Sequence, residues 1–102
     1  MTYSDRECYE QALPHKPDHA DAWYKLGIEG GGRVSGKAYS EKECYEQALQ
    51  HMPDYANAWY DLGNQGGGTV SRRAYSKKEC YEQAVQHKPD FANAKRALDG
   101  SA

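Results

Sequence analysis

Apolar and polar residues along the chain follow a pattern that repeats every 36 positions. The segment YSDRECYEQALPHKPDHA begins at Tyr3, and close copies of it begin at Tyr39 and Tyr75. The segments between them, DAWYKLGIEGGGRVSGKA and NAWYDLGNQGGGTVSRRA, keep the same spacing. The 102 residues are therefore expected to form a single domain, 1–102, built from one unit that occurs nearly three times. The units cover about 3–38, 39–74 and 75–100.

The first half of each unit predicts a helix that begins with a capping box. A serine, at positions 4, 40 and 76, is followed three residues later by a glutamate. In a capping box these two side chains bond each other's backbone N–H groups. The tyrosine before each serine and the cysteine four residues after it have the spacing of a hydrophobic staple. In the second unit Cys44, Tyr45, Ala48 and Leu49 then have helical spacing, and Pro53 ends the helix.

The second half of each unit predicts another helix, which ends at a run of glycines. Asp18, Asp54 and Asp90 directly follow a proline and are expected to cap it. The helix contains the pattern A-W-Y-x-L-G and stops at three consecutive glycines, because each glycine costs about 1 kcal/mol in a helix. The segment that leads to the next serine is expected to be a loop, which Val34 and Val70 attach to the core.

The run NAWYDLGN, together with CYEQAVQHKP, resembles the tetratricopeptide repeat over nearly the whole chain. The period of that family is about 34 residues, and the 36 found here is similar to SEL-like repeats. The resemblance implies an all-α fold, in which antiparallel helix hairpins stack into an α-solenoid with a right-handed superhelical twist. The last helix has Lys95 where its counterparts have Trp23 and Trp59, which predicts a polar cap at the end of the stack.

The resemblance also implies a function, because family members bind peptides or protein segments on the concave face. The positions that would line this face are Asp21, Tyr24, Ile28, Asn57, Tyr60 and Asn64. A tyrosine suits such a contact, since it offers a large ring and a hydroxyl at modest entropy cost. Packing of Tyr24 and Tyr60 between hairpins is an equally good interpretation. The chain is expected to be a non-enzymatic protein-interaction scaffold.

An alternative function uses the two terminal helices, which have a neighbour on one side only. The last helix of one copy could pack on the first helix of another, because they are of complementary types. The chain would then be a self-associating or engineered structural module, a homo-oligomer without a dedicated ligand. Lys95 argues against this contact, whereas the apolar face of the first helix argues for it.

Two sequence patterns that suggest a nucleotide or metal site have structural explanations. Gly31 to Lys37 is one residue short of a phosphate-binding P-loop, but Ala38 replaces the hydroxyl residue that would hold magnesium. The second copy of this segment also lacks the lysine. Cysteine and histidine recur seven residues apart, which is about 10 Å along a helix and too far for one metal ion. No catalytic, metal or cofactor site is expected.

Composition narrows the remaining functional classes. The net charge of -2 does not favour nucleic acid, and the basic residues near Arg72 and Lys77 are more typical of a solvated face. No apolar run approaches the roughly 18 residues of a membrane helix. Three cysteines, an odd number, and the lack of a secretory signal favour the reducing cytoplasm.

Overall fold

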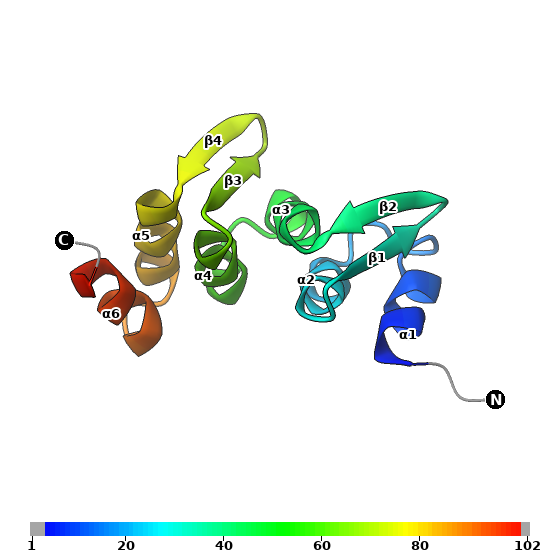
Figure 1. The fold of residues 1–102 in the computed structure, drawn as a ribbon, viewed down its shortest axis with the longest axis horizontal. Helices are drawn as coiled ribbons and strands as arrows, with labels where there is room; N and C mark the ends of the chain where they lie inside the picture. The colour runs from blue at the N-terminus through cyan, green and yellow to red at the C-terminus, as the bar shows by residue number, and fades with distance from the viewer. Residues whose placement is uncertain (1–3, 101–102) are drawn as a thin grey trace.

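The computed structural model describes residues 4–100, which form six helices and two β-hairpins arranged in a row (Figure 1). The elements in chain order are α1 (Asp5–Ala12), α2 (Ala20–Ile28), β1 (Gly31–Val34), β2 (Lys37–Ser40), α3 (Glu41–His51), α4 (Ala56–Asn64), β3 (Gly67–Val70), β4 (Arg73–Ser76), α5 (Lys77–His87) and α6 (Ala92–Gly100). The molecule is elongated, at 47 × 28 × 19 Å, with α1 and α6 at opposite ends. Both hairpins lie on the same side of the row (Figure 1).

The segments after the glycines are β-hairpins, so the prediction of an all-α solenoid is wrong and the fold is mixed α/β. Strand β1 pairs antiparallel with β2, from Gly31 opposite Ser40 to Val34 opposite Lys37, and β3 pairs with β4 in the same register. The turn residues at 35, 36, 71 and 72 all have positive φ. Two such residues in succession are typical of a type I′ turn, whose twist matches that of antiparallel strands. A purely helical repeat has no counterpart to this element.

The hairpins are attached to the helices at both ends. Val34 and Val70 are only 6% and 5% exposed, which confirms that these residues contact the core. At the other end Ser40 and Ser76 close the strands and also begin the next helix. Because the last strand residue is also the helix cap, each hairpin passes into the following helix without a linker.

The capping boxes are confirmed in all three units. The Glu43 N–H donates to Ser40 Oγ at 3.1 Å, and the Ser40 N–H donates to Glu43 Oε1 at 2.9 Å. The same pair of bonds occurs at the starts of α1 and α5. Tyr3, the predicted staple partner of the first unit, lies outside the described residues.

The predicted aspartate caps are wrong. Helix α2 begins after His19, whose Nδ1 accepts from the Ala22 N–H at 3.3 Å. Helix α4 begins after Tyr55, which makes no side-chain cap bond. Asp18 and Asp54 precede these two residues in the chain, and Phe91 separates Asp90 from α6 in the same way. Each of these three helices therefore begins one residue later than a cap at the aspartate requires.

A buried tryptophan in each of the first two units contacts the hairpin that leads into the next unit. Trp23 and Trp59 are 3% and 2% exposed. The Trp59 indole N–H donates to the Pro53 carbonyl at 2.7 Å, and its ring meets Tyr75 of the hairpin edge-to-face at 4.7 Å. Trp23 makes the equivalent contacts, with Pro17 and Tyr39. One side chain thus joins the turn before the helix to the hairpin after it. At the equivalent position of α6, Lys95 is exposed.

Successive units meet mainly where α2 packs against α3 and where α4 packs against α5. Gly27 and Gly63 make this approach possible, since a Cβ atom at either would lie 2.6 Å from the ring of Tyr45 or Tyr81. Cys44 and Cys80 are fully buried in the same contacts. The helices therefore pack closely wherever a glycine of one faces a tyrosine of the next.

Candidate binding surface

The six predicted binding positions lie on α2 and α4, and they differ in exposure. Asp21, Tyr24 and Tyr60 are half-buried, whereas Asn57 and Asn64 are exposed. Ile28 is 52% exposed, which is high for a large apolar side chain. The contacts of these residues separate them into two groups, one at each boundary between consecutive units.

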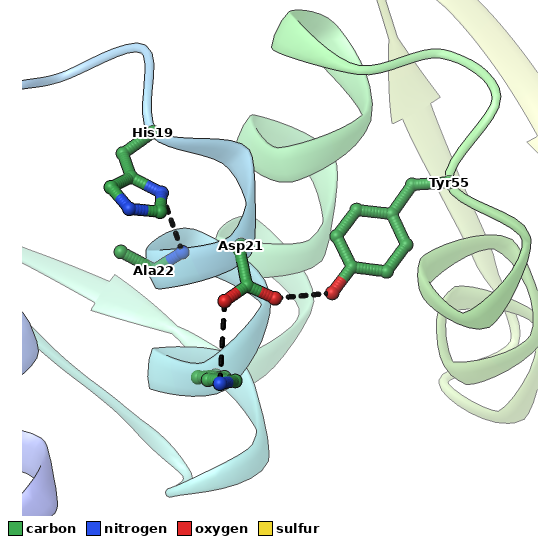
Figure 2. Close-up of polar contacts among 5 residues, drawn as sticks. His19, Asp21, Ala22 and Tyr55 are labelled. Atoms are coloured by element: carbon green, nitrogen blue, oxygen red, sulfur yellow. Dashed lines mark hydrogen bonds and ion pairs between the residues drawn. The ribbon is translucent and has the colours of Figure 1, made fainter.

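At the first boundary two tyrosine hydroxyls donate to carboxylates. The Tyr55 hydroxyl, from the turn before α4, donates to Asp21 Oδ1 on α2 at 2.7 Å (Figure 2). In the opposite direction the Tyr24 hydroxyl on α2 donates to Asp61 Oδ2 on α4 at 2.6 Å. The Tyr24 and Tyr55 rings pack together, with centroids 4.9 Å apart. We call Asp21, Tyr24, Tyr55 and Asp61 the first junction.

The two carboxylates of the first junction have opposite pKa shifts. The hydrogen bond from Tyr55 lowers the pKa of Asp21, with a further contribution from Lys25, whose Nζ lies 3.3 Å from Asp21 Oδ2. Burial raises the pKa of Asp61, although the bond from Tyr24 opposes that shift. Burial and the neighbouring carboxylates raise the pKa of both Tyr24 and Tyr55 well above the usual value for tyrosine. Both hydroxyls therefore stay protonated and can donate at neutral pH.

At the second boundary the same aromatic packing is present without the carboxylates. The Tyr60 ring lies 5.1 Å from Phe91 and 5.8 Å from Tyr81, centroid to centroid. Asn57, Phe91 and Ala97 occupy the positions of Asp21, Tyr55 and Asp61. Phe91 has no hydroxyl to donate, and Ala97 has no side-chain oxygen to accept. We call Asn57, Tyr60, Phe91 and Ala97 the second junction.

The polar side chains of the second junction lack the hydroxyl and carboxylate partners that their counterparts have at the first. Within residues 4–100, neither the Asn57 amide nor the Tyr60 hydroxyl makes a hydrogen bond to another side chain. Next to them at the end of α4, Asn64 Oδ1 accepts from the Tyr81 hydroxyl at 2.8 Å. That bond uses the oxygen of Asn64, and the NH₂ group of Asn64 donates to Asp61 on the same helix.

Sequence reasoning missed Tyr55 and Asp61, the partners of two predicted residues. A signal was present in the repeat, since the positions change in pairs between units. Where position 55 has a tyrosine its partner is Asp21, and where position 91 has a phenylalanine the equivalent partner is Asn57. A hydroxyl and its carboxylate are lost together, as expected for two side chains in contact.

We also searched the described part of the chain for small-molecule and metal sites. A shallow depression of about 460 Å³, lined by Gln50, Thr69, Ser71 and Arg72, lies between the end of α3 and the second hairpin turn. All four lining residues have polar side chains, whereas small-molecule sites are lined mainly by hydrophobic and aromatic residues. No three potential metal-ligating side chains come together within residues 4–100.

No protein-family model and no curated protein sequence matches this chain. The tetratricopeptide resemblance therefore stays a prediction. No helix in the described part of the chain is long and apolar enough to cross a membrane.

Proposed function

We propose that this chain is a non-enzymatic protein-interaction scaffold that binds a peptide or protein segment at the second junction. The observation that carries this proposal is the difference between the two junctions. At the first, Asp21 and Tyr24 bond to neighbouring side chains of the same chain. At the second, the equivalent Asn57 and Tyr60 keep these groups for a ligand.

The chemistry of these groups suits a polypeptide. An asparagine amide can donate to a backbone carbonyl and accept from a backbone N–H at once, so it pairs with an extended chain. A half-buried tyrosine adds an apolar ring and one further hydrogen bond. The exposed Ile28, at the end of α2, offers an apolar contact along the same row of helices.

Rigidity of the surface supports the same function. The rings on both sides of Tyr60 hold its orientation before a ligand arrives. A surface ordered in advance loses less conformational entropy on binding, which raises affinity without additional contacts. We place the protein in the cytoplasm, where a reducing environment suits its three free cysteines.

Peptide selection followed by matched substitutions tests this function. Peptides are selected from a displayed random library against the intact protein, and the affinity of the best one is measured by titration calorimetry. We expect Tyr60→Phe to weaken binding about five- to tenfold, the effect of one lost hydrogen bond, and Asn57→Ala to weaken it at least as much.

Tyr24→Phe is the control, because it removes the same atom at the first junction. It should leave the affinity within about twofold of the unmodified chain. Equal losses for Tyr24→Phe and Tyr60→Phe, or no loss for any variant, would contradict binding at the second junction.

A further inference from the structure

Helix α1 presents a face that its two counterparts bury. Cys8 and Ala12 are exposed and Tyr9 is half-buried, and α1 buries no residue of its own. The equivalent residues of α3, Cys44, Tyr45 and Ala48, are at most 2% exposed, and those of α5 are buried as well. We call Cys8, Tyr9 and Ala12 the α1 face. Helix α1 lies at one end of the row of helices (Figure 1).

Two charged side chains of α1, Arg6 and Glu10, bind elsewhere in their own unit, and the α1 face itself carries no charged residue. The Arg6 guanidinium donates to the Glu29 carbonyl at the end of α2. The Glu10 carboxylate accepts from the Arg33 N–H of β1 at 2.6 Å. Leu13, just after α1, is fully buried and packs in the core of the same unit. The side of α1 toward its own unit is therefore occupied. On the α1 face Tyr9 packs partly against the core, whereas Cys8 and Ala12 are exposed.

The other two interfaces show which kind of helix covers such a face. On α4 the contact with α5 is made by Tyr60, by Gly63 three residues later and by Asn64. Tyr60 packs 5.8 Å from the Tyr81 ring, Gly63 makes room for that ring, and Asn64 accepts its hydroxyl at 2.8 Å. Helix α2 covers α3 with Tyr24 and Gly27 in the same way. The covering helix has a stripe of tyrosine and then glycine three residues later.

A second copy of this chain cannot supply that stripe from its open end. In α6 the stripe reads Arg96 and Asp99 in place of tyrosine and glycine. Since a Cβ atom at Gly63 would already lie 2.6 Å from the Tyr81 ring, an aspartate there would displace the tyrosine of the next helix. Helices α2 and α4 of a second copy already cover their own α3 and α5.

We propose that the α1 face binds an amphipathic helix of another protein, one with a Tyr-x-x-Gly stripe and a hydrogen-bond acceptor after the glycine. The new contact continues the interface between units by one further helix. This site is separate from the second junction, because α1 belongs to the first unit and has no part in the contacts of Tyr60 or Asn57. Its test can therefore succeed or fail independently of the proposed function.

The test follows the reactivity of Cys8 toward a thiol reagent. Cys44 and Cys80 are fully buried, and burial raises the pKa of Cys44 to about 12 and that of Cys80 to about 11. Because a thiol reagent reacts slowly with these two buried thiols, fast labelling reports on Cys8. The probe is a synthetic peptide with the sequence of residues 54–66, which contains α4 and no cysteine. We expect this peptide to slow Cys8 labelling in a saturable manner.

A peptide of this length is only marginally helical in water, so a tethered form provides the second measurement. In this form a copy of residues 54–75 replaces residues 1–3, which reproduces the connection between α4 and α5. We expect Cys8 labelling to slow at least about tenfold, because the tether gives a high effective concentration. The control has aspartate for glycine at the position of Gly63 in the copy, and there Cys8 should label at the original rate.

Three results decide the matter. Protection by the tethered helix but not by its aspartate control supports the proposal, with or without protection by the free peptide. Labelling that is equally fast with and without the tethered helix overturns it. Light scattering that shows association of the unmodified chain, with loss of Cys8 reactivity at the same concentrations, also overturns it, because a second copy then covers the α1 face.

Discussion

A single oxygen atom on one ring distinguishes Tyr55 from Phe91, and with it the first junction from the second. The hydroxyl has a use only where a carboxylate accepts it, as Asp21 does at 2.7 Å. Where the hydroxyl is missing, the position of the carboxylate has the neutral Asn57. At this scale the two boundaries differ in polar chemistry while their aromatic packing stays the same.

Tyr24→Phe should destabilise the protein by about 1–2 kcal/mol, because the half-buried Asp61 carboxylate loses one of its hydrogen-bond donors. Tyr60→Phe, the matched change at the second junction, should cost less than about 0.5 kcal/mol, since Ala97 offers no acceptor side chain. The unfolding free energies from urea titrations of the three proteins provide the measurement. Equal costs for both variants would mean that the bond from Tyr24 to Asp61 adds nothing to stability.

Asp21 and Asp61 should give stability opposite dependences on pH. The pKa of Asp21 is lowered in the folded state, so its contribution is present above the ordinary value of 3.8 and is lost as pH falls through the lowered pKa. The pKa of Asp61 is raised, so its ionisation costs stability as pH rises from 3.8 through the raised pKa.

Replacement of each aspartate by asparagine isolates these contributions. Relative to the unmodified protein, Asp21→Asn should be less stable at neutral pH, and the difference should shrink in acid. Asp61→Asn, in contrast, should gain stability relative to the unmodified protein as pH rises above about 4. Denaturation midpoints at several pH values from about 3 to 7 measure both differences. Two differences that change in the same direction would show that the assigned shifts are wrong.

Residue-level prediction from sequence succeeded where the partners are close in the chain. Ser40 and Glu43 are three residues apart, so the motif itself contains the geometry of the capping box. Tyr24 and Asp61 are 37 residues apart, and only the packing of two units brings them together. The aspartate caps failed for a local reason, since the chain makes one more turn residue after each proline before the helix begins.

At the scale of elements, the hairpin is the feature that the repeat pattern concealed. Its strands have only four residues each and contain two glycines, so they lack the alternating apolar pattern of a typical strand. The pair Ser35–Gly36 is a hairpin turn signal, but the second copy reads Ser71–Arg72, which weakens it. The helices were predicted correctly because their apolar spacing is strong, and the serine capping boxes also mark the starts of α1, α3 and α5.

Two adjacent glycines test how the second hairpin closes. Gly66 and Gly67 have nearly the same φ, 93° and 98°, so alanine should cost about 1 kcal/mol of backbone strain at either. A Cβ atom at Gly66 meets no other atom within 4 Å, whereas at Gly67 it would lie 2.3 Å from the Tyr75 carbonyl oxygen. Gly67→Ala should therefore be less stable than Gly66→Ala by at least about 2 kcal/mol.

The unfolding free energies of the two alanine variants measure this difference, and circular dichroism checks that both still fold. Similar values for the two would mean that the backbone at Gly67 and Tyr75 separates easily. The close pairing of β3 with β4 would then contribute little to stability.

At the scale of the whole molecule, the units form a row in which each contacts its immediate neighbours. In such an arrangement, stability is close to a sum of unit and interface contributions, and the ends open first. Helix α1 buries no residue and α6 buries only Ala94, whereas α3 and α4 each bury four. The middle of the row should be the most stable part.

Native-state amide hydrogen exchange measures this gradient. Amides of α1 and α6 should exchange at least about tenfold faster than those of α3 and α4, because end helices of eight or nine residues are marginal without packing. Exchange in all helices with one common free energy would instead show that the chain unfolds as a single cooperative block.

The two hairpins have the same register, and this has a consequence for how such a chain could evolve. Each hairpin ends at a serine that also caps the helix that follows it. The backbone connection from one unit to the next is therefore the same at both hairpins. An in-frame duplication or deletion of 36 codons would join ends that already fit. The residues at the positions of Tyr55 and Asp61 would then decide, boundary by boundary, whether a junction bonds internally or stays open to a ligand. Lineages could in this way change the length of the row and the number of its binding surfaces while they keep one fold.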